Sequence, residues 1–156
     1  MSKQIPVLLI LLLGVCPVQA ADIAVIVGRD TPEITLTPAQ LENIFRKKTR
    51  LTPWSQAWVP VNLHANHRLR RAFSLQLFEQ PPEQQEEFWN IQYFNGITPP
   101  YVVTSEEAVL RFVTDTPNAI GYVLDCHLDA RVKVLLRLTA PEHSLPCVPG
   151  HAEVKP

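Results

Sequence analysis

The sequence predicts a single α/β domain in which a central β-sheet is flanked by helices. Short apolar runs typical of buried strands alternate with longer segments whose apolar residues recur at helical spacing. The chain has 156 residues, of which 46% are hydrophobic and 19% are charged. This length and composition suit one packed core, and they exclude a disordered chain, a collagen-like chain and a disulfide-dense scaffold.

The first 20 residues have the features of a secretory signal peptide. Lys3 precedes an apolar run of about ten residues, and Val18-Gln19-Ala20 has the small-x-small pattern of a cleavage site. The run is shorter than the roughly 20 residues that a membrane-spanning helix needs. We therefore expect residues 1–20 to be removed from the 156, which leaves 136 residues in the periplasm. An uncleaved anchor is the alternative; lipidation at Cys16 is disfavoured because Val15 precedes it.

Two cysteines remain after the leader. Cys126 and Cys147 form an even pair in an oxidising compartment, which predicts a disulfide, with two unrelated thiols as the alternative. Such a bridge would close a loop of about 20 residues and stabilise the fold by roughly 3 kcal/mol. We expect residues 21–140 to form the domain and the proline-rich residues 141–156 to form a C-terminal tail.

Local signals predict the positions of the elements. Thr37, Pro38 and Gln40 have the pattern of a capping box with proline at the first helical position, so a helix should begin there. Ser105 is expected to cap a later helix, with Val109, Phe112 and Val113 facing inward and Pro117 marking its end. Further helices are expected at 68–78 and 83–93, and strands at 23–27, 59–63, 120–124 and 132–138. Pro60 argues against a central position for the strand at 59–63.

Charge is unevenly distributed along the chain, although the formal net charge is only −1. Residues 46–71 contain seven cations and no acid: Arg46, Lys47, Lys48, Arg50, Arg68, Arg70 and Arg71. This segment runs into the predicted start of the helix at 68–78, where backbone N–H groups and the helix dipole favour an anion. The alternative is that these cations pair with acids of the following helices or remain solvated.

A candidate anion site follows from this arrangement. Asn66, His67 and Arg68 stand at the helix start, and Arg70 and Arg71 could add charge-assisted hydrogen bonds to phosphate, sulfate or a carboxylate. A plain capped helix with solvated arginines is the competing interpretation.

Other functions find little support in the sequence. There is no nucleophile motif, no glycine-rich phosphate loop and no spacing typical of paired catalytic carboxylates, so neither an enzyme nor a bound cofactor is predicted. His64, His67, Cys126 and His127 lack the spacing of a zinc site, and we predict no metal. Export and the acidity outside the basic segment disfavour nucleic-acid binding.

Several stretches, in order, resemble the phosphate-binding substrate-binding proteins of ABC transporters, a type II group of periplasmic binding proteins. They are LTPAQLENIFRKK at 36–48, Arg70-Arg71-Ala72-Phe73, and TPNAIGYV at 116–123, the last being the most specific. The resemblance covers about residues 23–125. It implies a single periplasmic-binding-protein-like lobe with a central sheet, because full-sized members have two lobes with the ligand between them.

The resemblance leads to two alternative hypotheses about function. Family members hold the oxyanion with Ser-Gly-Thr at a helix start, where this chain has His67-Arg68-Leu69. The first hypothesis is an exported solute-binding module that holds phosphate or another small anion for transport or sensing. The second is an accessory that binds no solute and docks on a membrane transporter or sensor. Trp54, Trp58, Trp89 and Tyr93 would then form an interaction surface, whereas core packing is their ordinary role.

Overall fold

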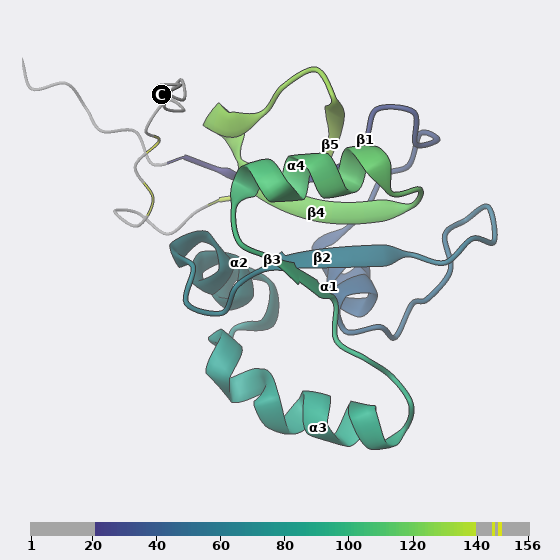
Figure 1. Ribbon diagram of the computed structural model, residues 1–156, viewed down its shortest axis with the longest axis vertical. Coiled ribbons are helices and arrows are strands. Elements are labelled where there is room, and N and C mark those ends of the chain that lie inside the picture. The colour runs from purple at the N-terminus through teal and green to yellow at the C-terminus, as the bar shows by residue number, and fades with distance from the viewer. Residues whose placement is uncertain (1–20, 140–144, 146, 148–156) are drawn as a thin grey trace, which may run out of the picture.

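The computed structural model describes residues 21–139, 145 and 147, and it confirms an α/β fold with a five-stranded central sheet (Figure 1). The expected signal peptide at 1–20 and most of the expected tail at 141–156 lie outside the described residues. The elements are β1 Ile23–Gly28, α1 Pro38–Phe45, β2 Val59–Leu63, α2 Arg68–Phe78, the 3-10 turn η1 Pro82–Gln85, α3 Glu86–Phe94, β3 Tyr101–Val103, α4 Glu106–Asp115, β4 Ala119–Leu124, the 3-10 turn η2 Asp125–His127 and β5 Val132–Leu138. None of the described helices combines the length and apolar character needed to cross a membrane.

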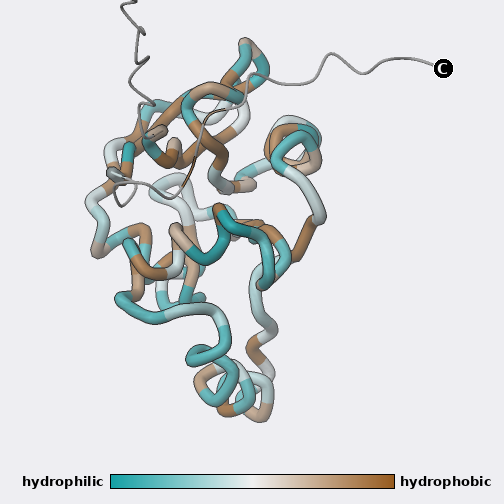
Figure 2. The backbone as a smooth tube through the Cα atoms, turned by 90° about the vertical axis from the view of Figure 1, so that its left-hand side faces the viewer, coloured by the Kyte–Doolittle hydropathy of each residue, from teal (hydrophilic) through white to brown (hydrophobic). Residues whose placement is uncertain are grey.

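The sheet has the strand order β3-β2-β4-β1-β5. β2 runs parallel to both β3 and β4, whereas β1 runs antiparallel to β4 and β5. Figure 2 shows the apolar strands at the centre of the molecule, with α3 set apart at the lower end. Because β2, β3 and β4 share a direction, their carboxyl ends meet at one edge of the sheet.

Helices cover both faces of the sheet, as two neighbouring residues of β4 show. Gly121 faces α4, since a Cβ there would lie 2.7 Å from Val109 Cγ1. Tyr122 points to the opposite face, as alternate strand residues do, and its ring stacks on Phe73 of α2 with centroids 3.7 Å apart. Phe45 of α1 adds an edge contact to Phe73 at 4.9 Å.

The close approach at Gly121 gives a testable prediction. In Gly121→Ala the new methyl would also lie 2.8 Å from Val61 Cγ1, so we expect a loss of about 1–3 kcal/mol in the free energy of unfolding. Urea denaturation measures this loss. Val109→Ala should partly rescue the variant by removing the nearest methyl, so that the double variant costs less than the two single changes together. Strict additivity would contradict the assigned contact.

Two expectations about elements need correction. β2 is an interior strand although it contains Pro60. Val59 N donates to Asn118 O, on the β4 side, at 3.0 Å. Because successive backbone N–H groups of a strand point in opposite directions, the N–H that Pro60 lacks would have pointed towards β3. β3 begins only opposite Val61, so no ladder bond is lost. The helix expected at 83–93 is divided into η1 and α3.

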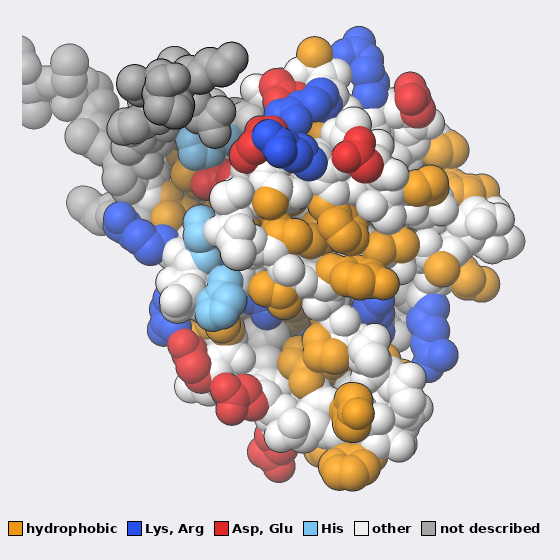
Figure 3. Space-filling model, in the orientation of Figure 1, with side chains coloured by type: hydrophobic (Ala, Val, Ile, Leu, Met, Phe, Trp, Pro, Cys, Tyr) orange, Lys and Arg blue, Asp and Glu red, His pale blue; other side chains and the backbone are white. Residues whose placement is uncertain are grey.

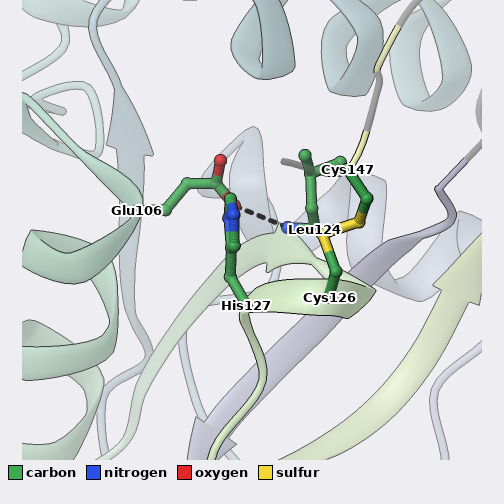
Figure 4. Close-up of a disulfide and its surroundings, with 5 residues drawn as sticks. All are labelled: Glu106, Leu124, Cys126, His127 and Cys147. Atoms are coloured by element: carbon green, nitrogen blue, oxygen red, sulfur yellow. Dashed lines mark hydrogen bonds and ion pairs between the residues drawn. A yellow bond between two sulfur atoms is a disulfide. The ribbon is translucent and has the colours of Figure 1, made fainter. Parts of the chain in front are cut away.

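The predicted disulfide is present. Cys126 of η2 is bonded to Cys147, with their Cα atoms 6.0 Å apart, and Figure 4 shows the bond beside His127. Nearby, Leu145 is buried and its carbonyl accepts a hydrogen bond from Ala21 N at 3.5 Å. The bridge therefore fixes the chain after β5 next to the first residues of the domain.

Candidate functional site

A crevice lies at the edge where the parallel strands end. α2 begins after β2 and α4 begins after β3, so two helix N-termini meet there, beside the end of β4. Such an edge is the usual ligand position in α/β sheets. The crevice has a volume of about 750 Å³, enough for a small solute. It is lined by His67, Ser105, Glu106, Glu107, Leu110, Arg111, Cys126, His127, Leu128 and Asp129.

The structure brings the predicted residues at the start of α2 together. His67 is the N-cap, and its Nδ1 accepts a hydrogen bond from Leu69 N at 3.2 Å. Asn66 Oδ1 lies 2.8 Å from His64 Nδ1 on the exposed turn before the helix. Arg68, the first helical residue, is exposed. His67 therefore occupies one of the backbone donors that a helix start would otherwise offer to an anion.

Arg70 differs from Arg68 and Arg71 because it is buried, with 8% of its surface exposed. Its side chain hydrogen-bonds to the Tyr122 hydroxyl, and that hydroxyl also accepts from Leu63 N at 3.3 Å and donates to Asn62 Oδ1 at 3.2 Å. Burial raises the pKa of Tyr122, so the hydroxyl stays neutral. Arg70 Nε and Nη1 have no hydrogen-bond partner within the described part of the chain. A buried cation with unsatisfied donors is costly, and a bound anion would remove that cost.

Arg71, the adjacent arginine, is engaged elsewhere. It forms an exposed ion pair with Glu83 of η1. That partnership also helps to lower the pKa of Glu83, after the larger effect of a backbone hydrogen bond. Arg70 and Arg71 therefore have different environments although they are sequence neighbours.

The basic segment 46–71 does not form one patch. Arg46 pairs with Glu42 at 2.8 Å and places its guanidinium 5.1 Å from the ring centre of Phe78, the last residue of α2. Arg68 is the first residue of the same helix, which has 11 residues and is therefore about 16 Å long. The cations at 46–50 thus lie near the far end of α2, away from the crevice.

The opposite wall of the crevice, at the start of α4, carries acids. Ser105 caps the helix by accepting from Ala108 N at 3.1 Å. Glu106 Oε2 accepts from Leu124 N at 2.7 Å and lies 2.8 Å from His127 Nδ1 (Figure 4). Arg131, with help from Arg111, holds the pKa of the Glu107 carboxyl at about 2.

These carboxylates decide which wall can hold an anion. A free anion near the start of α4 would face Glu106 and Glu107, and like charges repel at short range. The wall formed by α2 contributes His67, and Arg70 is buried three residues further along the same helix. Within residues 21–139, 145 and 147, no group of three or more His, Cys, Asp or Glu side chains is placed to hold a metal ion.

Sequence reasoning missed Glu106, His127 and Tyr122 as parts of this region. Glu106 only follows the expected helix cap at Ser105, and Tyr122 was expected only as part of a strand. The predicted disulfide could have drawn attention to His127, because His127 follows Cys126 directly and both residues line the crevice.

The chain is thus an α/β domain with a crevice at the edge where its parallel strands end. Solved structures of larger proteins contain a similar fold. The chain resembles an ABC-type phosphate transport receptor from Vibrio cholerae, with a TM-score of 0.58 and 20% identity over 74% of this chain and 46% of the receptor. It also resembles a candidate phosphate ABC transporter substrate-binding protein from Clostridium perfringens with bound phosphate, with a TM-score of 0.61 and 21% identity over 74% and 45% of the two chains.

A third similar structure is PstS from Borrelia burgdorferi, with a TM-score of 0.58 and 14% identity over 82% of this chain and 50% of that protein. The chain spans about half the length of these proteins. No protein-family model and no curated protein matches it. The expected resemblance to phosphate ABC transporter substrate-binding proteins is confirmed at the level of the fold.

Proposed function

We propose that this chain is an exported solute-binding module that holds a small anion at the start of α2, with Arg70 as its principal ligand. The observation that carries the proposal is the buried Arg70 guanidinium, whose Nε and Nη1 lack partners within the described residues. Each unpaired N–H of this buried cation can donate a charge-assisted hydrogen bond to an oxygen of a phosphate, a sulfate or a carboxylate. The structural neighbours that are named for phosphate make phosphate the first ligand to test.

Other groups at the helix start would complete the site. His67 lies at the crevice and supplies a second nitrogen, and its sequence neighbours Asn66 and Arg68 are exposed. Arg71 contributes little in this proposal because Glu83 already holds it. A module of this kind would deliver its anion to a membrane transporter or report it to a membrane sensor.

The proposal predicts opposite behaviour for two adjacent arginines. Calorimetric titration of the ligand-free protein with phosphate, sulfate and acetate should give saturable binding of at least one anion. Arg70→Gln should weaken that binding by about 30-fold or more, because it removes the buried positive charge that would contact the anion. Arg71→Gln is the matched control and should change the affinity by less than about threefold, since surface ion pairs contribute little.

The thermal unfolding of both variants shows whether each one is folded before it is titrated. Absence of binding heat with all three anions would contradict the proposal and favour an accessory that docks on a membrane partner. Equal losses of affinity in the two variants would contradict the role of Arg70.

A further inference from the structure

The surface of α3 is the largest feature that the proposed anion site does not use. This nine-residue helix contains no buried residue, and it stands apart from the rest of the fold (Figures 1 and 2). Phe88 turns towards the body, where the Arg46 guanidinium lies 5.3 Å from its ring centre. The last turn of the helix instead exposes Ile91, Tyr93 and Phe94, at 55%, 68% and 89% of their surfaces. Clustered exposed apolar side chains of this size are typical of an interaction surface.

The two ends of this surface carry opposite charges. Glu86 and Glu87 form the first turn of α3 and are exposed. Beyond its last turn, Lys47 and Arg50 line a small hollow together with residues 96–98. Figure 3 shows the three groups on one face, with acids to the left of the apolar side chains at the lower end and cations above them to the right. We call this acidic, apolar and cationic series the α3 surface.

We propose that the α3 surface binds the α3 surface of a second copy of this chain. A two-fold axis through the apolar turn brings Phe94 and its neighbours of both copies together. The same axis reverses the direction of the partner helix, so Glu86 and Glu87 of each copy face the Arg50 end of the other. A surface that is complementary to itself in this way forms a closed dimer, and its charges align the two copies.

The edge strand β3 is a weaker candidate for the same contact. Tyr101 and Val102 are exposed there, but β3 has three residues and follows Pro99 and Pro100. Short edge strands and adjacent prolines oppose pairing with another chain. Dimerisation through β3 is therefore an outcome that the experiment must distinguish.

Sedimentation equilibrium of the purified protein tests the proposal. We expect a reversible dimer at concentrations on the order of 100 µM, since a contact made mainly by one short helix buries little surface and small interfaces bind weakly. Phe94→Asp should raise the dissociation constant at least tenfold, whereas Leu75→Asp should leave it unchanged. Leu75 is a matched control because it is also an exposed apolar residue, 45% exposed, on α2. A protein that stays monomeric up to about 1 mM, or a dimer that Phe94→Asp does not weaken, would overturn the proposal.

A charge exchange tests the orientation of the two copies. Glu87→Lys and Arg50→Glu should each weaken self-association, because each variant opposes like charges twice across the two-fold axis. Mixing the two variants should restore a dimer, since both contacts in the mixed pair again join opposite charges. If the mixture dimerises no better than either variant alone, the antiparallel arrangement is wrong. Both residues are exposed, so the changes should leave the core intact.

Discussion

Phe73→Ala should destabilise the protein by about 3–5 kcal/mol. The Phe73 side chain is fully buried, stacks on Tyr122 at 3.7 Å and makes edge contacts with Phe45 and Phe78 at 4.9 and 6.3 Å. Its removal would leave a cavity between the sheet and two helices that well-packed neighbours can fill only in part. Urea denaturation, with the midpoint and slope fitted together, measures the change.

Leu75→Ala on the same helix is the control, because Leu75 lies at the surface, with 45% of its area exposed. That substitution should change the free energy of unfolding by less than about 0.5 kcal/mol. A loss below about 1 kcal/mol in Phe73→Ala would contradict the central place of this aromatic cluster. Since Phe73 supports Tyr122, which in turn contacts Arg70, the variant should also weaken anion binding if it remains folded.

Removal of the disulfide should have the second largest effect. Cys126 and Cys147 are 21 positions apart, and release of that loop in Cys126→Ser/Cys147→Ser should lower the free energy of unfolding by about 3 kcal/mol. The comparison requires denaturant titrations of both proteins with and without a reducing agent. Wild type under reducing conditions should approach the variant, and the variant itself should not respond to the reductant.

A different pattern would contradict the assigned bridge. Equal stability of the wild type and the variant without reducing agent would show that the bridge does not constrain the unfolded chain. Two titratable thiols in the purified, unreduced protein would show that the bridge does not form.

Much of the fold could be predicted because local signals and packing agree. The capping box at Thr37 and Gln40 forms as expected, and so does the cap at Ser105. The interior position of β2 could not be predicted, because the penalty at Pro60 depends on which neighbour its missing N–H would face. That direction follows only from the pairing of β2 with β4 and β3.

The candidate site could be predicted only in outline. Sequence reasoning located the start of α2, but it could not separate Arg70 from Arg71, since helical neighbours differ in environment only once the helix is packed. It could not place the acids of α4 opposite this helix start either, because that contact depends on the order of strands in the sheet. Trp54 and Trp58 pack against or within the core, whereas Tyr93 is exposed on the α3 surface.

A phosphate titration followed by 15N NMR tests the central claim most directly, since it reports where an anion binds. We expect the largest saturable shifts at the Arg70 side-chain Nε–H and at the backbone amides of residues 66–71. Residues 46–50 and the first turn of α4 should change little. Saturable shifts centred on either of those segments, or no saturable shift with phosphate, sulfate or acetate, would contradict an anion site built on Arg70.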